Sequence, residues 1–132
     1  MMNINVKKIS MTIVVFMITI NTFAQTNLNS TASPDSNVAY RLFPTTNMWN
    51  FIKLDTRDGR MWQVQYSTGD DKMEVPLSLT PRVSKEEAKN GRFFLYPTQN
   101  MWTFILLDQI DGRVWQVQWS TKSNERFVIP IN

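Results

Sequence analysis

Two pairs of aspartates are the residues whose type and spacing come nearest to a catalytic or cation-binding set. Both have the pattern Asp-x-x-Asp-Gly, Asp55 with Asp58 and Asp108 with Asp111. Two carboxylates can hydrolyse a glycosidic bond when they face each other across a cleft. Asp-Gly between two strand-like runs, however, is typical of a hairpin turn, in which the Asp side chain binds nearby backbone amides. We therefore expect these aspartates to shape turns, and we assign no catalytic and no metal-binding residue.

The amino-acid composition narrows the chemistry further. The sequence contains no histidine and no cysteine. This removes imidazole acid–base catalysis, thiol nucleophiles and the usual zinc ligand sets. We expect no cofactor, and a hydrolase that uses the aspartates is the least favoured function.

Aromatic and amide side chains at matching positions are the candidate ligand-binding residues. Trp49 and Trp102 are either packed in a core or subunit interface, or exposed as stacking platforms for a ligand such as a sugar. The amide side chains form two identical polar rows, Gln63 with Gln65 and Gln116 with Gln118. Such rows are either a solvated sheet face or, because amides both donate and accept hydrogen bonds, a surface for a glycan or a protein partner.

These residues recur because the chain contains an internal duplication. The segments 42–68 and 95–121 align at a constant offset of 53 positions, and 19 of their 27 residues are identical. A period of this size usually marks a repeated supersecondary unit. Any site on one unit should therefore have a twin on the other.

Each unit is predicted to contain about four short antiparallel strands. In the first unit they cover 39–44, 48–55, 60–68 and 75–79. The second unit repeats the first three 53 residues later and ends with a strand over 127–131. Ser84 and Glu87 form a capping box before Asn90-Gly91, which predicts one short connecting helix. The expected fold is all-β, two tandem units arranged as a barrel, a sandwich or propeller-like blades.

The strand before each hairpin and the strand after it differ in pattern. The segment 48–55 is apolar on both faces, as in a strand covered on both sides. The segment 60–68 alternates, so its two faces should have different surroundings. We expect the tryptophan side to pack on the core in both units, Trp62 and Val64 in the first and Trp115 and Val117 in the second, with the glutamines outside.

The N-terminal region reads as a targeting segment. Lys7 and Lys8 precede an apolar run over 9–20 that is too short to span a membrane easily, and Ala24 suits a signal-peptidase site. We expect a signal peptide over 1–24, a flexible leader over 25–37, and one domain over 38–132. The domain consists of repeats 38–79 and 92–132 joined by 80–91. The protein would be periplasmic or secreted, without membrane insertion after cleavage.

The charge balance argues against a nucleic-acid partner. The whole chain has a formal net charge of +3, but without residues 1–24 it has 12 basic and 11 acidic residues. Proteins that bind nucleic acids usually present a basic patch or stripe, and this sequence contains none. A glycan or an envelope protein is the expected partner, and a homo-oligomer is compatible with the pattern.

The second unit resembles small exported proteins of Bacteroidetes. The resemblance runs from Leu95-Tyr-Pro-Thr-Gln-Asn-Met-Trp to Val-Trp-Gln-Val-Gln-Trp119, and the signal ending Phe-Ala-Gln is similar to theirs. The resemblance covers most of the region after residue 24. It implies a bacterial envelope location and carries no activity or functional residue.

Three functions follow from these observations. The first is an exported, non-catalytic binding module that recognises a glycan or a protein. Its specific form is a propeller-like lectin, which must be oligomeric because two repeats alone cannot close such a ring. The second is a monomeric protein-interaction or inhibitor protein of the envelope. The third is the carboxylate-dependent hydrolase.

Overall fold

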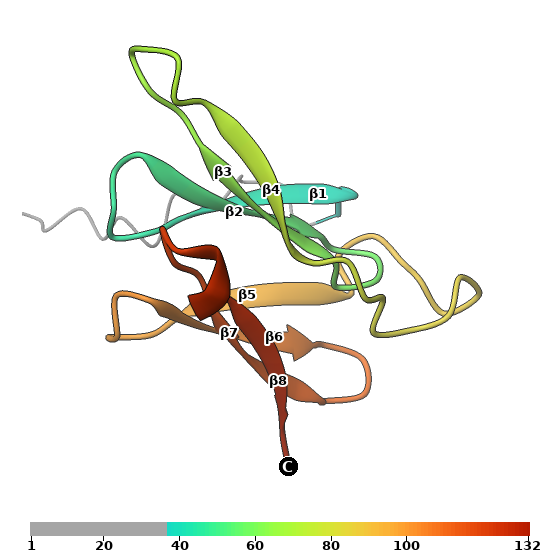
Figure 1. Ribbon diagram of the computed structural model, residues 1–132. Coiled ribbons are helices and arrows are strands. Elements are labelled where there is room, and N and C mark those ends of the chain that lie inside the picture. The colour runs from blue at the N-terminus through green and yellow to red at the C-terminus, as the bar shows by residue number, and fades with distance from the viewer. Residues whose placement is uncertain (1–36) are drawn as a thin grey trace, which may run out of the picture.

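The computed structural model describes residues 37–132, which fold into two four-stranded antiparallel sheets (Figure 1). The expected signal peptide and all but the last residue of the expected leader lie outside the described residues. The first sheet, sheet A, contains β1 (Tyr40–Pro44), β2 (Asn50–Asp55), β3 (Met61–Gln65) and β4 (Met73–Ser78). The second, sheet B, contains β5 (Phe93–Pro97), β6 (Thr103–Asp108), β7 (Val114–Gln118) and β8 (Phe127–Ile131).

Each sheet is a simple meander in which every strand pairs with the next one in the chain. The register repeats as well: Phe51 pairs with Val64 in sheet A, and Phe104 pairs with Val117 in sheet B. The two sheets are stacked face to face in the described part of the chain, with β2 against β5 and β4 against β8 (Figure 1). The prediction of an all-β fold made of two tandem four-stranded units is confirmed.

The predicted connecting helix over 84–90 is reduced to a single turn. Its capping box forms, since the Ser84 hydroxyl donates to Glu87 Oε2 at 3.0 Å. The Ala88 amide donates to the Ser84 carbonyl, and no longer ladder follows. Helix nucleation is unfavourable, and so short a segment has no apolar stripe that packing could stabilise. The one helical element assigned among residues 37–132 is the short 3₁₀ helix η2 (Ser123–Glu125), before β8.

The two faces of each sheet are named here after their side chains in β3 and β7. The glutamine face holds Gln63 in sheet A and Gln116 in sheet B. The tryptophan face holds Trp62 in sheet A and Trp115 in sheet B. Sheet B buries its tryptophan face, where Trp115, Val117 and Trp119 lie in the core, as predicted.

Sheet A does the opposite, so the prediction for its faces is wrong. Its glutamine face is the buried one, with Met61 and Gln63 fully inside, whereas Trp62 and Val64 are partly exposed. Lys53 on the tryptophan face of β2 stays at the surface, where its amine pairs with Glu74. The buried Gln63 amide donates to Asn50 Oδ1 at 3.0 Å, which reduces the cost of burying it.

One hydrophobic core joins the two sheets. Sheet A supplies Phe43, Ile52, Leu54 and Met61, and sheet B supplies the larger share. The sheet B residues are Phe93, Leu95, Phe104, Leu106, Trp115, Val117 and Trp119. The two repeats therefore share a single interior and stabilise each other.

Matching glycines close the two central hairpins. Gly59 and Gly112 have φ angles of 82° and 81°, which other residues rarely adopt. A Cβ on Gly59 would lie 2.8 Å from Cγ of Arg82 and 3.2 Å from the Phe93 ring, whereas a Cβ on Gly112 would meet nothing within 4 Å. The positive φ is therefore common to both, and the steric conflict exists only at Gly59.

Gly59→Ala is expected to destabilise the protein more than Gly112→Ala. The backbone strain should cost each variant about 1–2 kcal/mol, and overpacking against Arg82 and Phe93 should add about 1–3 kcal/mol at Gly59. Urea unfolding of the two variants measures the difference. Equal losses would mean that the Arg82 side chain moves aside without cost.

Candidate functional site

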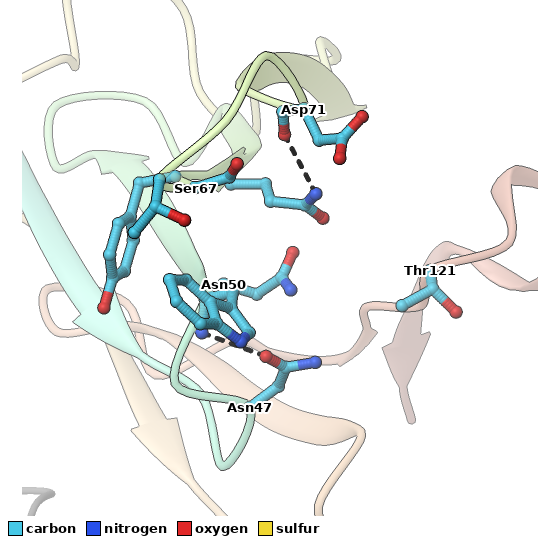
Figure 2. Close-up of a pocket in the computed structure, with 9 residues that line it drawn as sticks. Asn47, Asn50, Ser67, Asp71 and Thr121 are labelled. Carbon is cyan, nitrogen blue, oxygen red and sulfur yellow. Dashed lines mark hydrogen bonds between the residues drawn. The ribbon is translucent and has the colours of Figure 1, made fainter.

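A pocket of about 370 Å³ lies at one end of the stacked sheets. The β1–β2 loop, the start of β2, the end of β3 and the β3–β4 loop form most of its wall, and Thr121, just after β7, contributes from sheet B (Figure 2). Its lining residues are Asn47, Trp49, Asn50, Gln65, Tyr66, Ser67, Thr68, Asp71 and Thr121. The pocket thus combines aromatic, amide, hydroxyl and carboxylate side chains.

The β1–β2 loop holds Trp49 in place through side chain–backbone hydrogen bonds. The Thr45 hydroxyl donates to the Asn50 carbonyl at 2.9 Å and accepts from the Asn47 amide at 3.1 Å. Asn47 Oδ1 in turn accepts from the Trp49 amide at 2.9 Å, forming an Asx turn. The local sequence therefore fixes the backbone at Trp49, from which the indole projects.

Trp49 and Tyr66 form an exposed aromatic surface beside the pocket. Their ring centroids are 5.1 Å apart, and the rings are tilted by 52°. Trp49 is 37% exposed and Tyr66 is 44% exposed. Phe51 supports Tyr66 from the neighbouring strand at 6.1 Å. Two large side chains with few rotatable bonds offer contact area at low entropic cost.

The polar wall of the pocket is also constrained. Gln65 donates through Nε2 to the Asp71 carbonyl at 3.0 Å, which leaves Gln65 Oε1 as an acceptor (Figure 2). The buried Gln63 donates to Asn50 Oδ1, which fixes the orientation of the Asn50 amide. The Asp71 carboxylate lies at the rim of the pocket. These groups supply both donors and acceptors for a hydroxyl-rich molecule.

The second repeat reproduces the loop but not the exposed aromatic pair. Asn100 Oδ1 accepts from the Trp102 amide at 2.9 Å, as Asn47 does for Trp49. Trp102 contacts Trp119, with ring centroids 4.7 Å apart and the rings tilted by 44°, and it packs against the core. Trp119, the counterpart of the exposed Tyr66, is fully buried and donates to the Met101 carbonyl at 3.0 Å. The twin surface that the duplication predicts is therefore turned inward.

The predicted site residues fall into different places. Trp49 and Gln65 line the pocket together, and Gln63 lies behind it in the core. Gln116 lies on the outer face of sheet B, and Gln118 holds the β7–β8 loop by donating to the Glu125 carbonyl. The remaining candidate, Trp102, is partly buried.

Sequence reasoning missed most of the pocket residues. These were Asn47, Asn50, Tyr66, Ser67, Thr68, Asp71 and Thr121. The repeated motif Thr-x-Asn-Met-Trp was a usable signal for Asn47, since it places an amide two residues before each tryptophan. No comparable signal pointed to Asp71, and the sequence did not indicate that Thr121 of the second repeat lies beside the first, because the fold brings both in from loops.

The first aspartate pair shapes its hairpin, as predicted. Asp55 Oδ1 accepts from the Arg57 amide and Asp58 Oδ1 from the Arg60 amide, both at 3.1 Å. Burial raises the pKa of Asp55, but hydrogen bonds from Arg57 and the charges of Arg57 and Arg60 outweigh it, so the pKa lies below its ordinary value. The stabilisation from Asp55 is thus present above pH 3.8, the ordinary pKa, and is lost as the pH falls through the lower folded value.

The second pair also serves its turn and is bound by arginines. Asp108 is fully buried and accepts from Arg92 Nη2 at 2.8 Å, while Oδ1 accepts from the Ile110 amide at 3.0 Å. Asp111 accepts from Arg113 Nε at 2.6 Å. Within residues 37–132 no group of three or more acidic, histidine or cysteine side chains could hold a metal ion. The geometry of these aspartates is that of structural ion pairs.

Fold and site together define the protein as a stacked pair of four-stranded antiparallel sheets with an aromatic and amide pocket at one end. Comparisons of the chain with protein-family models, curated proteins and solved structures gave no match. In the portion that the structure describes, no helix has the length and apolar character needed to cross a membrane.

Proposed function

We propose that the protein is an exported, non-catalytic binding protein that recognises a carbohydrate in the pocket beside Trp49. The observation that carries this proposal is the combination of two adjacent exposed rings, Trp49 and Tyr66, with the amides of Asn50 and Gln65. The signal-like sequence over 1–24 supports export to the periplasm or the medium.

A sugar presents two kinds of surface, and the pocket offers a partner for each. The apolar C–H face of a sugar ring packs on an aromatic side chain, as other apolar groups do. Its hydroxyls both donate and accept, which suits the Asn50 and Gln65 amides and the Asp71 carboxylate. The volume of about 370 Å³ is at the small end of ligand sites and favours a short saccharide or the end of a longer chain.

Preorganisation strengthens the proposal. The Asn47 turn holds the backbone of Trp49, Gln63 holds the Asn50 side chain, and the Asp71 carbonyl holds the Gln65 side chain. A site whose side chains are already fixed loses less conformational entropy when a ligand binds. This arrangement makes specific binding attainable for a small, strongly hydrated ligand.

Trp49→Ala is expected to weaken sugar binding at least tenfold, a change of about 1.4 kcal/mol, because it removes the stacking surface. A glycan array would identify a ligand, and titration calorimetry would compare the variants. Met48→Ala is the matched control, since Met48 is the adjacent loop residue, is 65% exposed and does not line the pocket.

Asp71→Asn tests the polar wall in the same titration and should reduce affinity without altering the fold. Failure of the unmodified protein to bind any array glycan would contradict the proposal. Equal affinity of Trp49→Ala and the unmodified protein would place the sugar elsewhere on the molecule.

A further inference from the structure

The two repeats pack with unlike faces in contact. Sheet A contributes its glutamine face to the shared core, and sheet B contributes its tryptophan face. The outward surfaces are therefore the tryptophan face of sheet A and the glutamine face of sheet B. Because the repeats descend from one duplicated sequence, each outward surface is the counterpart of a surface that is buried inside the molecule.

The glutamine faces correspond closely. Ile52, Leu54 and Gln63, buried in sheet A, are Ile105, Leu107 and Gln116 on the outer face of sheet B. The other core positions change conservatively: Phe43 becomes Tyr96 and Met61 becomes Val114. The outer face of sheet B thus has most of the side chains that sheet A uses to cover a tryptophan face.

The tryptophan faces show the same relation. Four core residues of sheet B are identical to their counterparts on the outer face of sheet A. The pairs are Leu95 with Leu42, Phe104 with Phe51, Trp115 with Trp62, and Val117 with Val64. The two outer surfaces of the molecule are therefore the counterparts of the two faces that pack against each other in its core.

Both outer surfaces carry exposed apolar side chains. Tyr40 and Leu42 are exposed on sheet A, and Tyr96, Ile129 and Ile131 are exposed on sheet B. A hollow of about 430 Å³ on sheet A is lined by three apolar or aromatic side chains and three charged ones: Tyr40, Leu42, Val64, Arg41, Lys53 and Glu74. Exposed apolar side chains gathered on one face favour an interaction site there.

The outer face of sheet A carries an ion pair that its buried counterpart in sheet B lacks. Lys53 pairs with Glu74 and lies 4.8 Å from the Trp62 ring centroid, where sheet B has Leu106. The two charges cancel, and the amine rests on an aromatic face. Such a pair keeps the surface soluble, and covering it costs desolvation that the attraction between the two charges offsets only in part.

We propose that copies of this chain associate head to tail and close into a ring, with the outer glutamine face of sheet B on the outer tryptophan face of sheet A of the next copy. Tyr66 lies on this tryptophan face beside Trp49 and Phe51, so the contact covers the sugar-binding rings and ring closure competes with sugar binding. Unlike faces in contact generate rings when the rotation closes. Rings of four-stranded sheets typically contain about four to eight sheets. With two sheets per chain, the expected ring therefore has about two to four chains.

The first test is the mass in solution of the protein purified from bacteria that express the full chain. Multi-angle light scattering should give a fixed multiple of the chain mass over a concentration range on the order of 1–100 µM, as expected for a closed, stable assembly. A monomer at every concentration would overturn the proposal. A mass that grows without limit would overturn ring closure.

Three variants locate the contact. Ile129→Asp blocks the glutamine face of sheet B, and Leu42→Asp blocks the tryptophan face of sheet A; each should weaken association at least tenfold. Ile110→Asp is the matched control, because Ile110 is exposed at the tip of the β6–β7 hairpin, away from both faces. Circular dichroism establishes that each variant keeps its β structure, and Ile131→Asp replaces any glutamine-face variant that does not fold.

Mixing the two blocked variants decides between unlike and like faces. Ile129→Asp retains a free tryptophan face and Leu42→Asp a free glutamine face, so an equal mixture should form a one-to-one dimer and stop. A contact between two like faces would leave one of these variants fully associated by itself and give no such dimer in the mixture, which would overturn the proposal.

Discussion

Replacing Trp115 with alanine is expected to cost about 3–5 kcal/mol of unfolding free energy, whereas the same change at Trp62 should cost about 1 kcal/mol. The two residues occupy the same position in the two repeats. Trp115 is 6% exposed and packs between the sheets against Phe93, with ring centroids 6.1 Å apart. Trp62 lies on the outer face, where water covers part of its ring.

The comparison measures which face of each repeat forms the core. Both variants are best made in the Ile129→Asp background and unfolded with urea at low protein concentration, so that chain association does not contribute. Equal losses would show that the two repeats bury the same face, contrary to the structure. A larger loss at Trp62 would reverse the assignment.

The strands were predictable because their signals are local. Alternating apolar residues, Asp-Gly turns and a 53-residue offset define four strands per repeat, and the last strand, 127–131, is found at the predicted residues. Strand boundaries shifted by a few residues elsewhere, as at β3, which ends at Gln65 rather than Thr68. Beyond Gln65 the chain turns into the loop that lines the pocket.

The pattern within one strand does not determine which face of a sheet is buried, and the buried face of sheet A was predicted wrongly. In β3 the tryptophan side is the more apolar one, yet Gln63 is inside. The neighbouring strand β2 favours the glutamine side, since Ile52 pairs with Gln63 and Leu54 with Met61, whereas Lys53 pairs with Trp62. The buried face of sheet A therefore depends on adjacent strands and not on the pattern of β3 alone.

The pocket was predicted only where the duplication marked it. Trp49 and Gln65 were candidates because each recurs in the second repeat. Asp71 and Thr121 belong to loops whose position depends on how the sheets stack, which sequence periodicity does not report. The duplication also led to a wrong expectation, a twin site in the second repeat. There Trp119 takes the place of Tyr66 and is buried.

Asp108→Asn is the second variant for which a large loss is expected, about 3–5 kcal/mol. Asp108 is fully buried, and Arg92, which donates to it through Nε and Nη2, is only 6% exposed. Asparagine keeps an acceptor for the turn but removes the charge, so the guanidinium of Arg92 stays inside without a full partner. Asp111, 3.6 Å from Arg92, compensates only in part.

Asp55→Asn provides the matched comparison, because Asp55 holds the same position in the first hairpin and is equally buried. Its partners differ: Arg57 and Arg60 are 39% and 34% exposed, so water can solvate them once the carboxylate is gone. The expected loss is about 1 kcal/mol, and urea unfolding measures both variants.

Combining Arg92→Met with Asp108→Asn should recover part of the loss, because the double variant no longer buries an unpaired charge. If the double variant is less stable than Asp108→Asn alone, Arg92 contributes through its contact with the Glu87 carbonyl rather than through Asp108. If Asp55→Asn and Asp108→Asn lose the same free energy, the burial of the arginine is not the cause. The hairpin turn, which both aspartates share, would then account for the whole effect.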